Sequence, residues 1–257
     1  TIVNRIQNGY SEIPMNTFIH HMKSTRNLRK MIINHKALDS KLCPLPLTAE
    51  GMQWMENDNT YEKQTKLWVP IKYHNPDFLK WTMNIGLSIT DIELFCNPAN
   101  HSMPVHLDGN ELHDEFKLNY AFNPRGNSLM NWFKPKPNTI GKREGVRYKN
   151  KDERNIDTAD LYWYPEEVDL IESHDVEVSI VQVGQPHNVT TTQHSRKCLS
   201  CVFDKRLVNG YTTNEDIILK EDLHIIAKRR DEAVGKKILQ DIVPMWEAID
   251  LFKKYII

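Results

Sequence analysis

Residues 177–203, EVSIVQVGQPHNVTTTQHSRKCLSCVF, hold two β-like runs on either side of the turn-forming segment GQP. His187 follows that turn, and His194 lies in a predicted hairpin turn before the second run. Side chains alternate along a strand. A strand beginning near Ser195 therefore places one set of residues on a shared face: Arg196, Cys198, Ser200 and Val202. The opposite face then carries Lys197, Leu199, Cys201 and Phe203.

The same pattern of short strands extends over residues 86–205. Turn signals such as NP, DG and NPRGN separate most of the runs. The other runs are LSITDIELFC (87–96), MPVHLDG (103–109), EFKLNYAFN (115–123), SLMNWFK (128–134), LYWYP (161–165) and VDLIESH (168–174). Many short antiparallel strands around one core predict a sandwich or jelly-roll barrel, so the chain is expected to be mainly β with flanking helices (α+β).

Three further regions surround or interrupt this core. Residues 1–85 are expected to form a helical and irregular flank, with helix-like spacing over 16–36 and short β-compatible pieces from 41 to 85. Residues 206–257 are expected to be helical, with Pro244 breaking or restarting the helix. Residues 134–154 contain eight Lys or Arg and three Asp or Glu. This basic insertion is expected to be a loop that acts as a mobile lid or contacts substrate.

Composition limits the class of protein. The 257 residues are 40% hydrophobic and 26% charged, and the net charge is -1. This balance gives no overall attraction to nucleic acid or to an anionic membrane. The chain has no apolar run long enough to span a membrane and no signal-like start, so we expect a cytoplasmic protein. The CLSC pair, Cys198 and Cys201, is expected to point to opposite strand faces as buried thiols.

His106 and Asp108 are two residues apart on a predicted strand, so both side chains leave the same face and could chelate a metal. Such a triplet occurs easily by chance and needs supporting context. The context here is His187, a third candidate ligand, followed nine residues later by Arg196. A guanidinium that points into a barrel needs an acidic partner, and its planar fork suits a carboxylate.

These residues resemble the Fe(II)- and 2-oxoglutarate-dependent dioxygenases, whose double-stranded β-helix (a cupin-like jelly roll) binds iron through an HxD…H triad. KLNYAFNPRGNSLMNWF (117–133) resembles the segment that follows HxD in many viral and bacterial members, and QPHNV (185–189) resembles their PHxV sequence around the last ligand. The resemblance covers about 86–205. It implies an oxidoreductase that uses Fe(II), 2-oxoglutarate and O₂ to hydroxylate a C–H bond, with release of succinate and CO₂.

The resemblance also implies individual roles. His106, Asp108 and His187 would be the catalytic metal ligands, and Arg196 would bind the distal carboxylate of 2-oxoglutarate. Asn119, on the strand after HxD, is a candidate polar contact to the cosubstrate. Family members often carry serine two residues past the arginine; here that residue is cysteine, and Ser200 is the nearest hydroxyl.

Alternatives remain at three levels. His113 with Glu115 offers a second chelating pair, and His194 could replace His187 as the third ligand. The whole barrel could be a cupin-like module that binds a metal or ligand without catalysis. The substrate could be an amino acid, a peptide side chain or a nucleobase; nucleic-acid binding through the basic insertion and a homodimer are both possible.

Overall fold

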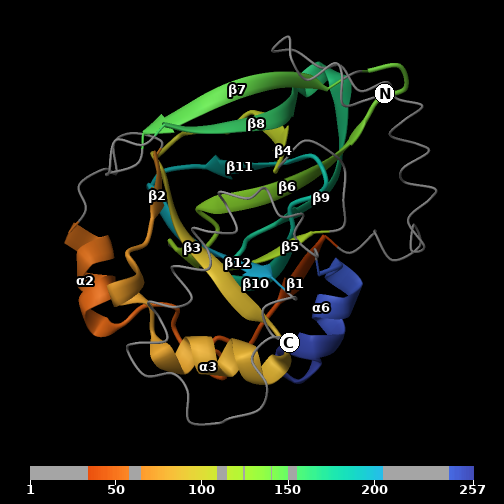
Figure 1. The fold of residues 1–257 in the computed structure, drawn as a ribbon. Helices are drawn as coiled ribbons and strands as arrows, with labels where there is room; N and C mark the ends of the chain where they lie inside the picture. Colours follow the sequence, from red (N-terminus) through yellow and green to blue (C-terminus); the bar gives the residue numbers. More distant parts are fainter. Residues whose placement is uncertain are drawn as a thin grey trace.

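The computed structural model describes the β-region almost completely. The described residues are 34–57, 65–108, 115–123, 125–139, 141–149, 155–204 and 243–257. The residues described form twelve strands in two six-stranded sheets, and every strand pairing in both sheets is antiparallel (Figure 1).

The first sheet has the order β1-β10-β5-β12-β3-β2. Its strands, in chain order, are β1 (His35–Ala37), β2 (Thr65–Trp68), β3 (Ser88–Asn97), β5 (Phe116–Phe122), β10 (Val178–Gln182) and β12 (Arg196–Asp204). The second sheet has the order β7-β8-β4-β11-β6-β9. Its strands are β4 (Val105–Leu107), β6 (Ser128–Pro135), β7 (Lys142–Lys149), β8 (Asn155–Trp163), β9 (Val168–His174) and β11 (His187–Thr191).

The chain crosses repeatedly between the two sheets in two stretches. It alternates from β3 to β4, β5 and β6, and again from β9 to β10, β11 and β12. These eight strands form a jelly roll with four strands in each sheet, and the remaining four strands extend the sheets at their edges. The expected mainly β fold with a jelly-roll core is confirmed.

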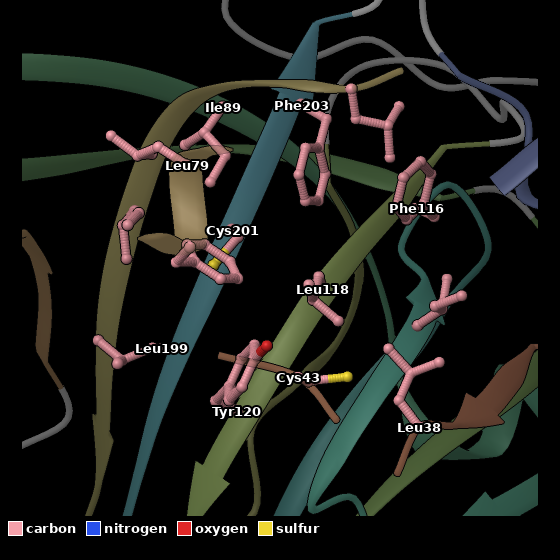
Figure 2. Close-up of a cluster of buried hydrophobic side chains, with 14 of the residues drawn as sticks. Leu38, Cys43, Leu79, Ile89, Phe116, Leu118, Tyr120, Leu199, Cys201 and Phe203 are labelled. Atoms are coloured by element: carbon pink, nitrogen blue, oxygen red, sulfur yellow. The ribbon is translucent and has the colours of Figure 1, made fainter. Parts of the chain in front are cut away.

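Three helices lie on the face of the first sheet that points away from the second sheet (Figure 1). They are α2 (Ala49–Asn57), α3 (Pro76–Ile85) and α6 (Met245–Phe252). Fully buried apolar residues join these helices to the sheet, as the close-up of Leu79, Leu118, Leu199 and Phe203 shows (Figure 2). The largest hydrophobic cluster therefore lies between the first sheet and the helices.

Strand β12 has the alternation that its sequence predicts. Leu199, Cys201 and Phe203 lie in the helix-side cluster, whereas Arg196 and Cys198 line a pocket between the sheets. Cys198 and Cys201 are buried free thiols on opposite faces, and burial raises the pKa of each. The thiols are thus protonated at neutral pH and unsuited to joint metal binding or disulfide formation.

Within residues 41–85, where short β-compatible pieces were expected, the structure has the strand β2 and also two helices, α2 and α3. Helix α3 begins at an Asn75 cap whose side chain accepts a hydrogen bond from Asp77 N, and Pro76 occupies the first turn. It ends at Gly86, whose φ of 102° is the left-handed conformation that closes many helices. Asn75, Pro76 and Gly86 are visible in the sequence as helix start and stop signals. They predict this helix better than the prolines and tryptophans of the stretch predict strands.

The basic insertion also differs from its prediction. Residues 142–149 form β7, which pairs with β8 from Lys142↔Tyr162 to Lys149↔Asn155, rather than a loop. Strand β7 is the edge of the second sheet, where charged side chains are common because one side of the strand has no neighbour. Its expected role as a lid or substrate contact stays a prediction.

The terminal predictions are tested only in part. Most of the expected helix over 16–36 lies outside the described residues, and its last two positions, His35 and Lys36, belong to strand β1. The expected helix before Pro244 likewise lies almost entirely outside them. Pro244 is the N-cap of α6, as a proline that restarts a helix would be.

Candidate metal centre

His106 and His187 are brought together by strand pairing. They are 81 positions apart in the chain, yet they are direct partners where β4 meets β11. Their ring centroids are 4.5 Å apart, and the residues are only 8% and 4% exposed. Adjacent antiparallel strands thus place two imidazoles on the same inner face.

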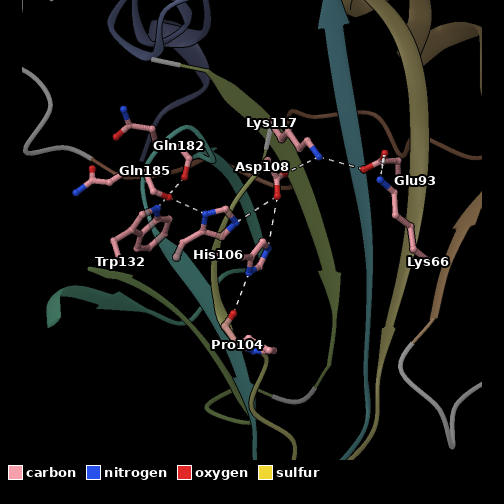
Figure 3. Close-up of polar contacts among 10 residues, drawn as sticks. Lys66, Glu93, Pro104, His106, Asp108, Lys117, Trp132, Gln182 and Gln185 are labelled. Carbon is pink, nitrogen blue, oxygen red and sulfur yellow. Dashed lines mark hydrogen bonds and ion pairs between the residues drawn. The ribbon is translucent and has the colours of Figure 1, made fainter. Parts of the chain in front are cut away.

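Asp108 lies one residue beyond the end of β4, on the face that His106 occupies (Figure 3). Its backbone N–H donates to the Val183 carbonyl across 3.2 Å, which continues the alternation past the strand end. Asp108 Oδ1 is 3.5 Å from His106 Nε2 and 3.8 Å from His187 Nε2. Among the described residues, these three form the only group of His, Cys, Asp or Glu whose candidate ligand atoms all lie within 4.8 Å of one another.

Backbone carbonyls orient both imidazoles. His106 Nδ1 lies 2.9 Å from the Pro104 carbonyl, and His187 Nδ1 lies 2.8 Å from the Gln185 carbonyl. A carbonyl only accepts, so each Nδ1 carries the proton and donates it, and each Nε2 lone pair faces the carboxylate. Metal-binding histidines in proteins are commonly held in this way.

Electrostatics favours a neutral imidazole at His187 and an ionised carboxylate at Asp108. Burial, helped by the neighbouring His106, lowers the pKa of His187 to about 4, so its ring is neutral at pH 7. Burial is the largest influence on Asp108 and opposes its ionisation. Lys117 and the two histidines together outweigh burial and hold the pKa of the carboxyl well below its usual range. These are the protonation states that a metal ligand requires.

The donor set fits a divalent first-row metal. Two imidazole nitrogens and one carboxylate oxygen on one side of a site, with the other positions open, are the arrangement associated with non-haem Fe(II) oxygenases. The arrangement can thus hold such an ion while it leaves room for small oxygen ligands. The predicted triad residues are brought together as expected, and their role as ligands stays a proposal.

A pocket between the sheets opens onto this cluster. It contains about 440 Å³ of space free of protein atoms, part of it open to solvent. The wall from the first sheet is mostly polar, and the wall from the second sheet carries the two histidines together with apolar residues. Besides the triad, the lining residues are Phe95, Asn97, Met103, Lys117, Asn119, Met130, Val183, Val189, Arg196, Cys198 and Ser200.

Arg196 lies on the polar wall and is only 3% exposed. It pairs in register with Asn97, and its Nη1 donates to Asn97 Oδ1 across 3.3 Å. Within the described residues, no acidic side chain forms an ion pair with this guanidinium. A buried cation without a countercharge in a pocket is suited to bind a carboxylate ligand.

Asn119 and Ser200 line the same wall as Arg196, and Ser200 is four residues further along β12. They are direct partners across β5 and β12, and they are 6% and 2% exposed. Asn119 Oδ1 has no hydrogen-bond partner among the described atoms. A buried amide oxygen with spare hydrogen-bonding capacity is able to accept a hydrogen bond from a polar ligand. The predicted candidates for cosubstrate contact thus lie together in one pocket.

Sequence reasoning assigned no role to three charged residues in this region. Lys117 Nζ lies 2.9 Å from Asp108 Oδ2 and 3.1 Å from Glu93 Oε2, and Glu93 Oε1 lies 2.6 Å from Lys66 Nζ (Figure 3). Lys117 is two residues before Asn119 on β5, so strand alternation could have placed it on the pocket wall. The position of Lys117 in the sequence does not indicate that Glu93 and Asp108 are its partners.

The competing histidines do not join the cluster. His194 is exposed in the turn between β11 and β12, where its backbone carbonyl and N–H both bond to the Asn127 side chain. His101 precedes β4, and its backbone pairs with Thr191. His113 lies outside the described residues, so the pair of His113 with Glu115 is not placed.

Comparisons with known proteins add little to this geometry. No protein-family model matches the chain, and no curated protein matches it. Among solved structures, the chain is similar to a prolyl hydroxylase from Trichoplax adhaerens in complex with a hypoxia inducible factor oxygen degradation domain peptide fragment. That match has 13% identity and a TM-score of 0.31, and it covers 83% of this chain and 91% of the other.

A helix that crosses a membrane must be long and apolar. Among the described residues, none of the helices combines the length and the apolar composition needed to cross a membrane.

Proposed function

We propose that this protein is an Fe(II)- and 2-oxoglutarate-dependent dioxygenase that hydroxylates a C–H bond of its substrate. The balanced reaction takes the C–H group, 2-oxoglutarate and O₂ to the C–OH group, succinate and CO₂. One observation carries the proposal. Two carbonyl-anchored imidazoles and an ionised carboxylate share a pocket with a buried arginine that has no acidic partner among the described residues.

Each residue has a physical task in this proposal. His106, Asp108 and His187 hold Fe(II), which when bound supplies the redox chemistry with O₂ and the 2-oxo acid. Arg196 binds the distal carboxylate of 2-oxoglutarate with its planar fork. Asn119 and Ser200 offer an amide and a hydroxyl to the same ligand from the adjacent strands.

The pocket also has features that suit the shielding of a reactive centre. Met103, Met130, Val183 and Val189 line the pocket together with the triad. Apolar side chains near the metal exclude water from the reaction, and this reduces side reactions of reactive species. The substrate itself is an amino acid, a peptide side chain or a nucleobase, approaching from the open side of the pocket.

Turnover without substrate is the most direct experiment. Purified protein supplied with Fe(II), ascorbate and 2-oxoglutarate should release succinate slowly. Under anaerobic conditions, 2-oxoglutarate should produce a visible absorption band on the Fe(II)-loaded protein. Absence of both signals in protein shown to be folded would contradict the proposal and would favour a non-catalytic cupin-like binding module.

A further inference from the structure

We propose that Lys117 is a positioning residue for the metal centre, and that it fixes which oxygen of Asp108 is available to a metal. The inference rests on the proposed function, because it assigns a role to a residue beside the same triad. Its contact with the triad is through Oδ2 of Asp108, the oxygen that does not face the imidazoles.

The two oxygens of Asp108 have different surroundings. Oδ1 faces both imidazoles, 3.5 Å from His106 Nε2 and 3.8 Å from His187 Nε2. Oδ2 lies 2.9 Å from Lys117 Nζ, within the distance of a charge-assisted hydrogen bond. In this position, Oδ1 of Asp108 faces the two imidazoles, and Oδ2 is hydrogen-bonded to Lys117.

Lys117 is itself held from behind. Its ammonium group also lies 3.1 Å from Glu93 Oε2, and Glu93 Oε1 lies 2.6 Å from Lys66 Nζ. The side chains of Glu93 and Lys117 are only 4% and 10% exposed, so solvent screens these ion pairs weakly. The line of alternating charges from Lys66 to Asp108 fixes the lysine between two carboxylates.

This line of charges also connects the two sheets. Lys66, Glu93 and Lys117 lie on β2, β3 and β5 of the first sheet, whereas Asp108 directly follows β4 of the second. The position of the carboxylate relative to the histidines is therefore set from the opposite sheet. A residue with only a structural role would join the sheets without affecting the coordination of an ion.

Coordination chemistry explains why the distinction matters. A carboxylate can bind a metal through one oxygen or through both. Binding through both would occupy one of the positions that the proposed reaction needs for 2-oxoglutarate and O₂. By engaging Oδ2, Lys117 favours binding through Oδ1 alone and keeps that position open.

Cobalt(II) provides a test that does not depend on activity. Wild type, Lys117→Met and Lys117→Arg are titrated with Co(II), and both affinity and the visible d–d spectrum are recorded. Lys117→Met should weaken Co(II) binding by about 10- to 100-fold, as is typical when a group that orients a metal ligand is lost. Its spectrum should also change, and Lys117→Arg should restore most of the affinity and the wild-type spectrum.

Controls separate this role from a loss of folding and from failure of the proposed function. Lys136→Met removes an exposed lysine that lies 3.7 Å from Asp169, and should leave Co(II) binding unchanged. Thermal unfolding confirms that each variant is folded. If Lys117→Met does not fold, Glu93→Gln replaces it, because Glu93 holds Lys117 from the other side, and an unaltered spectrum and affinity in Glu93→Gln would then overturn the inference.

The outcomes for the two proposals are distinct. Equal or tighter Co(II) binding by folded Lys117→Met, with an unaltered spectrum, overturns the positioning role alone. Wild-type protein that binds no Co(II) at all overturns both the positioning role and the proposed function.

Discussion

The two faces of the first sheet use the same strands for opposite purposes. On β5, Leu118 points into the helix-side cluster and is fully buried, whereas Lys117 and Asn119 point into the pocket between the sheets. On β12, Leu199 lies in the helix-side cluster, whereas Arg196 lines the pocket. Each strand therefore contributes to the hydrophobic core with alternate residues and to the candidate site with the rest.

The difference shows where the energy of this fold comes from. Removing apolar side chains from water stabilises the helix-side face, roughly in proportion to the buried area. Buried ion pairs add little net stability and a buried charge without a partner costs free energy, so a sheet face that carries the Lys117–Glu93 pair and Arg196 is not explained by stability. We infer that the pocket face is retained for binding, and four predictions test this division.

The largest effect is expected from removal of a candidate ligand on the pocket side. His187→Ala should weaken Co(II) binding by at least about 100-fold, more than is typical for residues that only support a ligand, and should abolish succinate formation. His194→Ala, in an exposed turn seven residues later, is the matched control and should change neither. Isothermal titration measures the affinity; equal effects of the two variants would contradict the assignment.

A change on the helix side should act on stability alone. Leu118→Ala removes a fully buried side chain and should lower the free energy of unfolding by about 3 kcal/mol, measured by urea denaturation. Leu170→Ala, at a residue that is 58% exposed, should cost less than about 0.5 kcal/mol. Weaker Co(II) binding by folded Leu118→Ala would show that the two faces are not independent.

A smaller and more selective effect is expected at the polar wall. Arg196→Met should weaken 2-oxoglutarate binding by about 30-fold, equivalent to about 2 kcal/mol, because a buried carboxylate would lose its cation. Its Co(II) affinity should stay at the wild-type value. Arg125→Met, which removes an arginine with an 86% exposed side chain, serves as the control. Unchanged 2-oxoglutarate binding in Arg196→Met would favour the cupin-like module.

The smallest effect is a pH dependence on the inner face. Burial, helped by His174 and Lys36, lowers the pKa of His35 from 6.5 to about 4. The unfolded chain therefore takes up a proton first, and stability should fall as the pH drops from about 6.5 towards about 4. His35→Gln should reduce that fall, whereas His194→Gln should not. Urea midpoints at pH 7 and pH 5 measure it, and identical pH slopes would be contrary to this assignment.

Much of the site could be predicted because strand alternation is a local property. The spacing of His106 and Asp108 places both on one face, and the spacing of Arg196 and Ser200 does the same on β12. The structure brings these residues and His187 to one pocket. The predicted burial of the CLSC cysteines on opposite faces is also confirmed.

Other features could not be predicted from local patterns. The ion pairs from Lys66 through Glu93 to Lys117 join three strands that are separated by long stretches of chain. The sequence of β7 carries many charged residues, as loops often do. The segment belongs to the second sheet because it pairs with β8. Pairing between distant segments depends on the whole fold, because a strand has no internal hydrogen bonds of its own.

The amino-acid sequence by itself determined which side chains share a strand face, since that follows from a repeat of two residues, and so it determined the candidate ligands and the apolar face. The tertiary structure alone decided that His187 pairs with His106 across β11 and β4, and that Lys117 reaches Asp108 from the opposite sheet. The physical reason is that hydrogen-bond register between strands and packing between sheets are set by contacts far apart in the chain.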